Sequence, residues 1–323
     1  MNRLDELRLQ TSPVLTALAA GYKVAGVIGD SVLPIIRATS DSVKLPKFSA
    51  DALPTGDDLR ALRAAPKQGK WGVTYVTVAL EEHSVDYPAD WRELQAGDVV
   101  GLDVLARNAR SAKRAVVLGR EKAVAQLLTS PSSYAAGHSE TVGAGYGWNE
   151  KTSGNSNVDV VDVILAKAEL LRQKVGVTPN VFWAGAAAWN AIARNTYVLD
   201  RMAFAPAAIA ARQVTKEAFA AAIGVSRVLV GGAVASSDGS TISDIWGDAA
   251  GLCYVEDNPN EVEAPTFGML AMRVWQQGAE NTYGFTATWD DAGGLVRHVA
   301  YVEFYKPFVS MPEAGYLWLD TVK

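Results

Sequence analysis

The sequence predicts a protein of the α+β class, and three observations carry the prediction. The stretch from Val99 to Thr129 has no proline and repeats apolar residues at helical spacing. The run from Gly72 to Leu80 alternates with period two and is rich in β-branched residues, as strands are. Helical and strand patterns alternate from Asp159 to Gly232, and mostly strand patterns follow to the end of the chain. One long helix, an isolated strand excursion and a mixed lobe together indicate the α+β class.

Residues 1–38 are expected to form an N-terminal arm. A short helical stretch precedes AGVIGDSVLPIIRA, an apolar segment that Gly29 and Pro34 interrupt. The segment offers too few long-range anchors to fold alone. We therefore expect an arm at this end of the chain and no independent domain.

Residues 39–90 are predicted to be an extended excursion of two strands. Proline and glycine are scattered through KLPKFSADALPTGDDL, and the run GKWGVTYVTVAL that follows later has the strand pattern. The turn is expected within RAAPKQGKWG. A two-stranded excursion is marginally stable at best in water, so we expect it to need a partner.

Residues 91–154 are expected to be built on one long helix. Asp98 stands where an N-cap belongs, and the helix would run to Thr129 with Gly101 and Gly119 as interior glycines. At 1.5 Å per residue it would be roughly 45 Å long, which is unusual in a compact enzyme domain. Its apolar stripe consists of Leu102, Leu105, Ala109, Ala112, Val116, Ala123 and Leu127.

The other side of this helix is basic, although the chain as a whole carries a formal net charge of -5. The acidic balance argues against nucleic-acid binding over the whole surface. A solvated face, packaged nucleic acid or an acidic neighbour would each account for the local positive charge. The candidate DNA-facing stripe is Arg107, Arg110, Lys113 and Arg114, and Arg120 and Lys122 continue the basic side with Glu121 as its only acid.

Residues 155–290 are expected to form an α/β lobe, and residues 291–323 a closing set of strands. A helix from Asp159 to Lys174, ended by Gly176, precedes the buried strand NVFWAG and the short helix AAAWNAIARN. The helix TKEAFAAAIG then leads to a second buried strand, SRVLVGG. The remaining chain is mostly strands, and DDAGG is predicted to be a hairpin turn.

The passage GAGYGWN invites comparison with phosphate-binding loops, because Gly143, Gly145 and Gly147 stand at every second position before Trp148. A dinucleotide fingerprint follows a strand and opens directly into a helix. This passage follows a helix instead, and polar residues separate it from the next one. We expect the glycines to let the chain turn between the helix and the lobe, with Trp148 packed at the crossing.

Residues that usually carry catalysis show no such arrangement. His83, His138 and His298 each lack a second ligand at metal spacing, and the single cysteine, Cys253, lies in the apolar run GLCYVE. No Gly-x-Ser-x-Gly elbow is present. We predict a protein that is not an enzyme, binds no cofactor or metal, and does not cross a membrane. A soluble nucleotide-binding enzyme is the weaker alternative.

Trp71 is the tryptophan that one subunit would bury least easily, since it lies in a polar loop tip beside Lys67 and Lys70. Aromatic residues are enriched where subunit interfaces exclude water. A contact with another subunit is therefore as reasonable as core packing for this side chain.

In their order along the chain, these parts resemble the major capsid proteins of tailed bacteriophages, which have the Hong Kong 97-like fold. The resemblance is carried by SPVLTALAAGYKVAGVIGDSVLPII, LGREKAVAQLLTS, GYGWNEKTSGNSNVDVVDVILAKAELL, TPNVFWAGAAAWNAIARN and SDIWGDAAGLCYV. It implies an N-terminal arm at 1–38, an extended loop with flanking strands at 39–90, an axial domain at 155–290, and a peripheral domain at 91–154 that the strands of 291–323 close.

The resemblance also implies a function without catalysis. Many copies would associate as hexamers and pentamers into an icosahedral head that encloses double-stranded DNA, assembled in the host cytoplasm. Lys67, Lys70 and Trp71 would then be candidate subunit contacts, and portal, scaffolding and decoration proteins candidate partners. Within the same fold, the alternative is an encapsulin-type compartment; the extended arm, in place of an amphipathic cargo-docking helix, favours the phage head.

Overall fold

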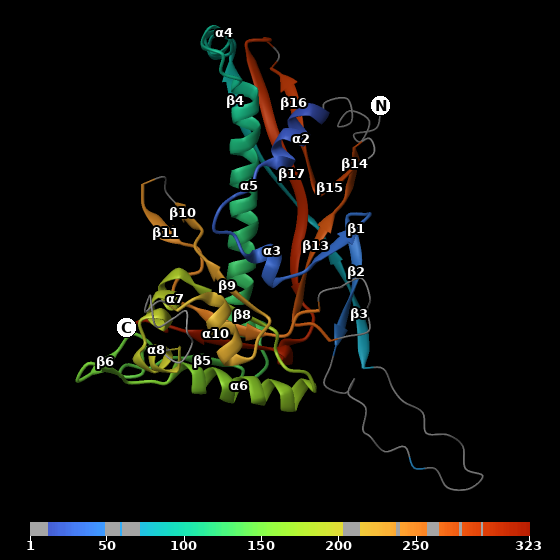
Figure 1. The fold of residues 1–323 in the computed structure, drawn as a ribbon. Coiled ribbons are helices and arrows are strands. Elements are labelled where there is room, and N and C mark those ends of the chain that lie inside the picture. The colour runs from blue at the N-terminus through green and yellow to red at the C-terminus, as the bar shows by residue number, and fades with distance from the viewer. Residues whose placement is uncertain are drawn as a thin grey trace.

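The computed structural model describes residues 12–48, 59, 72–202, 214–236, 240–256, 265–277, 280–291 and 293–323. Within these residues, one long helix joins a sheet that lies along it to a second sheet near its C-terminal end (Figure 1). The helix is α5 (Val104–Leu128), and the longest strand beside it is β17 (Val296–Val309). Among the helices of these ranges, none combines the length and apolar character that crossing a membrane requires.

The first sheet is centred on β17. Its order is β1 (Ile35–Ala38), β13 (Gly268–Arg273), β17 and β16 (Gly284–Asp290), with β4 (Glu81–Asp90) also paired to β17. The first ten residues of β17 pair with β4, and its last residues pair with β13. Strand β17 thus pairs with β4 from the first third of the chain and with β13 and β16 from its last quarter, so this sheet cannot form from local sequence alone.

The long helix starts later than the sequence indicates. Asp98 is not its N-cap: it lies inside a separate helix, α4 (Trp91–Val100), which Asp90 caps. Gly101 ends α4 in the left-handed conformation, with φ 73°, and Asp103 then caps α5 by accepting a hydrogen bond from the Ala106 amide. Glycine takes this conformation without a Cβ clash, which is why the helix breaks there. The remaining helix is about 38 Å long.

The second sheet lies under a layer of helices. Its strand order is β5 (Ser139–Thr141), β18 (Gly315–Leu319), β12 (Ala250–Cys253), β8 (Val181–Gly185) and β9 (Arg227–Gly231). Four helices belong to this lobe: α6 (Val160–Val175), α7 (Ala186–Ala193), α8 (Thr196–Met202) and α10 (Lys216–Ile223). The helix predicted from Asp159 to Lys174 and its stop at Gly176 are confirmed for α6, in which Asp159 is the N-cap. Every residue of β8 is buried.

The strands of the two sheets do not follow the ranges 155–290 and 291–323 expected from the sequence. Strands β13 and β16 lie within 155–290, yet they pair with β17 in the first sheet. Strand β18 lies within 291–323, yet it pairs with β12 and β5 in the second. The tight turn before Val296 places β16 directly beside β17, and the short 3-10 turn Pro312–Ala314 carries the chain from β17 to β18.

Two short helices and four two-stranded units project from this frame or brace it. Strand β2 (Ser42–Phe48) pairs antiparallel with β3 (Val73–Ala79), which confirms the predicted excursion at its base. Lys67, Lys70 and Trp71 lie outside the described residues. The other elements are the helices α2 (Pro13–Gly21) and α3 (Gly29–Val32) and three hairpins, β6 (Lys151–Thr152) with β7 (Asn155–Ser156), β10 (Val234–Ser236) with β11 (Ile242–Asp244), and β14 (Trp275–Gln277) with β15 (Glu280–Thr282).

Two large apolar clusters hold the structure together. One lies where the arm, the end of α5 and both sheets meet, and it includes Leu33, Leu128 and Trp183. The other fills the lobe of the second sheet and includes Trp148 and Phe219. Since the first cluster draws on both sheets, burial of apolar surface couples the two lobes.

Candidate assembly surface and its internal supports

The predicted basic stripe divides into exposed and anchored side chains. Arg107, Arg110 and Arg114 are exposed on α5. Lys113 is half-buried, and its Nζ donates a hydrogen bond to the Ala19 carbonyl at 2.6 Å. Burial lowers the pKa of Lys113. Lys113 therefore ties α2 to α5, and three guanidinium groups remain for the outer surface.

Arg120 does not belong to the solvated face. Its side chain is buried, and its guanidinium bonds bidentately to the Asp30 carboxylate, with Nε to Oδ1 at 3.0 Å and Nη2 to Oδ2 at 2.6 Å. Nη1 donates to Glu303, whose side chain is 3% exposed. Burial by itself lowers the pKa of Arg120, but the charges of Glu303 and Asp30 outweigh it, so the pKa is raised. The ion network joins the arm, α5 and β17.

Glu121 is also buried, and it joins the arm to Trp246, in the segment between β11 and β12. Oε1 accepts hydrogen bonds from the Ile28 amide at 2.8 Å and from the Trp246 indole at 2.7 Å. Oε2 accepts from the Gly29 amide at 2.8 Å. A Cβ on Gly29 would lie 2.6 Å from Oε2, so any larger residue there would have to displace the bonded carboxylate. Burial raises the pKa of Glu121, and the three hydrogen bonds oppose that rise.

Glu121→Gln is expected to change how stability depends on pH. Because the pKa of Glu121 is raised in the folded state, the folded protein keeps this proton at a pH where the unfolded chain has released it. The contribution of Glu121 to the free energy of unfolding is therefore fully present below the ordinary glutamate pKa and declines as pH rises through the raised pKa. Denaturant unfolding of both proteins from about pH 4 to pH 8 should show the wild type losing stability relative to the variant. If the difference in free energy of unfolding between the wild type and the variant does not vary with pH, the raised pKa of Glu121 is contradicted.

The turn at Gly143 to Trp148 follows β5, the edge strand of the second sheet, and leads to the β6–β7 hairpin. Gly145 has φ 86°, in the left-handed region, and its carbonyl accepts a hydrogen bond from Asn157. Trp148 is buried, and its ring meets Trp318 of β18 edge-on, with centroids 6.0 Å apart. The Trp148 amide donates to the Thr321 carbonyl at 2.8 Å. The loop is thus held by apolar packing and by the C-terminal segment of the chain.

Gly145→Val is expected to lower the free energy of unfolding by about 1–3 kcal/mol, because a β-branched residue is strained at positive φ. Gly143→Val is the matched control, since its backbone is outside the left-handed region and a Cβ there meets nothing within 4 Å. Denaturant unfolding of the two variants gives the comparison. Equal stability of the two variants would contradict the strain at Gly145, and added nucleotide should stabilise neither.

The histidines and the cysteine occupy separate structural positions. His83 stacks on Tyr305 at 3.9 Å, His138 lies 3.1 Å from the Gly315 carbonyl oxygen, and His298 lies 2.6 Å from Asp86. Cys253 is buried, and burial raises the pKa of its thiol to about 12. Within the described ranges, no group of three or more His, Cys, Asp or Glu residues could hold a metal ion. These side chains pack the two lobes.

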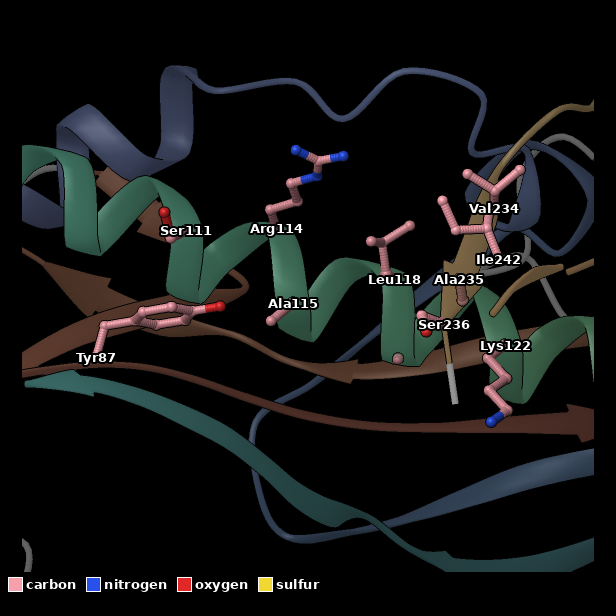
Figure 2. A pocket seen from close by; sticks show the side chains of 11 residues that line it. Tyr87, Ser111, Arg114, Ala115, Leu118, Lys122, Val234, Ala235, Ser236 and Ile242 are labelled. Carbon is pink, nitrogen blue, oxygen red and sulfur yellow. The ribbon is translucent and has the colours of Figure 1, made fainter. Parts of the chain in front are cut away.

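The exposed side of α5 opens onto a groove of about 590 Å³ (Figure 2). One wall is α5, with Arg114, Leu118 and Lys122, and the other is the β10–β11 hairpin, with Val234 and Ile242. Sequence reasoning missed both this groove and the buried network of Asp30, Arg120 and Glu303. No local pattern signals the network, because Asp30 and Glu303 lie 90 and 183 residues from Arg120 in sequence.

The architecture described above is the fold of the Hong Kong 97-like capsid proteins. The chain has a TM-score of 0.72 to a phage-related protein from Bordetella bronchiseptica RB50, at 21% identity over 96% of this chain and 97% of the other. It has a TM-score of 0.54 to the capsid structure of the cyanophage P-SCSP1u, at 10% identity over 93% and 91%. These likenesses concern the fold alone.

Sequence similarity carries the identification further. The chain is 30% identical over 319 residues to the major capsid protein of Burkholderia phage BcepMu, which covers 98% of each chain. No family model matches the sequence. The chain belongs to the family of bacteriophage major capsid proteins, and its role is that of a capsid shell protein in the virion.

Proposed function

We propose that many copies of this chain associate as hexamers and pentamers into a closed icosahedral head that encloses double-stranded DNA. The observation that carries the proposal is the 30% identity to a phage major capsid protein across 98% of both chains. The fold supports it, because two lobes braced by α5 form a unit from which the β10–β11 hairpin and the β2–β3 strand pair project. Assembly in the host cytoplasm, with portal, scaffolding or decoration proteins as partners, belongs to the same proposal.

The loop between β2 and β3 is proposed to lie over a neighbouring subunit, with Lys67, Lys70 and Trp71 as its contacts. The strand pair β2–β3, from which this loop extends, supports the proposed contact with a neighbour. Tyr75 is 62% exposed and Val76 is 37% exposed, although two-stranded sheets need a covered apolar face to be stable. A neighbouring subunit would supply that cover.

Sedimentation of the purified full chain tests the assembly proposal. Particles of many subunits that protect DNA from nuclease are expected, together with free capsomers of five or six chains. A chain that lacks residues 60–72 should remain folded and yet give few stable particles. The proposal fails if the intact chain stays at 34.4 kDa under every assembly condition. Particles that contain protein cargo and no DNA would favour the encapsulin-type alternative.

Arg107 and Arg110 are proposed to face the packaged DNA, since both are exposed on the basic side of α5. Replacing both with glutamate should lower the DNA retained per particle and reduce the salt dependence of that retention, because phosphate contacts release counterions. The subunit should unfold at nearly the same denaturant concentration as the wild type, since neither side chain is buried. Unchanged DNA content would assign these residues to a solvated face.

A further inference from the structure

The groove between α5 and the β10–β11 hairpin has the chemistry of a protein-binding site. Leu118 lies on its α5 wall, and Val234 and Ile242 lie on its hairpin wall (Figure 2). Val234 is 45% exposed and Ile242 is 72% exposed, so the described residues leave these apolar side chains largely uncovered. Arg114 and Lys122 supply positive charge along the same wall of α5.

The spacing of these groups specifies an occupant. Arg114 and Lys122 are eight residues apart on one helix, which places their Cα atoms about 12 Å apart. A suitable occupant therefore presents apolar side chains together with more than one carboxylate, because the two cations are too far apart for a single carboxylate to pair with both. A purely anionic ligand would leave the apolar wall in contact with water.

The chain itself carries a segment with this chemistry at α4 and the turn after it. Val99 is 84% exposed and Leu102 is 49% exposed. Glu93 and Asp98 are exposed on the same helix. Residues 90–103 contain four acids and one arginine, a net charge of −3 by count, so the segment is complementary in charge to the groove.

The α4 segment of one subunit cannot reach the groove of the same subunit. Helix α4 precedes the N-terminus of α5, whereas Leu118 in the groove lies 14 residues along α5, about 21 Å from its start. Figure 1 shows α4 and the β10–β11 hairpin at separate places along this helix. A contact between them must therefore join two copies, and it pairs different surfaces, as contacts in closed rings do.

We propose that the groove between α5 and the β10–β11 hairpin receives the α4 segment of a neighbouring copy. Val99 and Leu102 of that copy would cover Val234 and Ile242, while its Glu93 and Asp98 pair with Arg114 and Lys122 of this one. The inference rests on the proposed self-assembly. It adds to that proposal the two surfaces, the groove and the α4 segment, that form one contact between subunits.

Disulfide cross-linking in assembled particles tests the contact directly. A chain with both Val99→Cys and Ile242→Cys should form a ladder of covalently linked subunits under mild oxidation, because the sole native cysteine is buried. A chain with Val14→Cys and Ile242→Cys is the matched control, since Val14 is 78% exposed but lies on α2. The control should give no ladder. The inference is overturned if the Val99→Cys, Ile242→Cys chain forms normal particles but no more cross-linked subunits than the control. That result would leave the assembly proposal intact.

Charge reversal tests the pairing. Arg114→Glu with Lys122→Glu should lower particle yield by about tenfold or more, and Glu93→Lys with Asp98→Lys should do the same, because each places like charges together. Combining all four substitutions should restore the yield to within about twofold. If the four substitutions together do not restore the particle yield, the proposed contact is wrong. It is also wrong if the Arg114→Glu, Lys122→Glu variant forms particles that only retain less DNA, while the Glu93→Lys, Asp98→Lys variant assembles normally.

Discussion

Arg120→Met is expected to lower the free energy of unfolding of the subunit by about 3–5 kcal/mol, because it leaves a buried carboxylate without its partner. The carboxylate is that of Glu303, whose side chain is 3% exposed in β17. Asp30, which bonds to the other edge of the guanidinium, is 40% exposed and can regain water. Denaturant unfolding monitored by circular dichroism measures the loss.

Two controls separate loss of the ion network from loss of packing. A double variant, Arg120→Met with Glu303→Leu, should recover most of the stability, since no unpaired charge then remains buried. Arg110→Met, on the exposed side of the same helix, should change stability by less than about 0.5 kcal/mol. If Arg120→Met behaves like Arg110→Met, the network does not hold the arm to β17.

Trp148→Ala is expected to lower the free energy of unfolding by about 3–5 kcal/mol, since it removes a large side chain from a closed core. The Trp148 ring is 1% exposed and packs in the cluster that includes Phe219 and Trp318. Its loss also removes the edge-on contact with Trp318 and loosens the attachment of the loop to the C-terminal segment. The same unfolding measurement gives the result.

Tyr146→Ala is the matched control, because Tyr146 lies in the same loop and is 68% exposed. It should change stability by less than about 0.5 kcal/mol. A large effect of Tyr146→Ala together with a small effect of Trp148→Ala would contradict the packing described for this turn.

Local patterns predicted the elements whose signals lie in adjacent residues. Helix α6 begins after Asp159 and ends at Gly176, because a capping carboxylate and a left-handed glycine act within one turn of the helix. Strand β8 was recognisable as a continuous apolar run. The start of the long helix was misplaced at Asp98, because Asp98 and Asp103 are both good caps in sequence. Only the conformation of Gly101 decides between them.

Features that depend on distant partners could not be predicted. Arg120 belongs to a basic helix in sequence, yet it is buried because Asp30 and Glu303 meet it from segments 90 and 183 residues away. The pairing of β13 and β16 with β17 likewise depends on which strand each meets in space. The groove needs the β10–β11 hairpin beside α5, and no local signal places it there.

Electron cryomicroscopy of particles assembled from the purified full chain tests the central claim most directly. We expect closed shells whose reconstruction shows icosahedral symmetry, with five-fold capsomers at the vertices, six-fold capsomers between them and one copy of this fold per subunit position. Monomers or dimers alone, under every condition tried and with a folded chain, would contradict the assignment of this protein as a self-assembling capsid subunit.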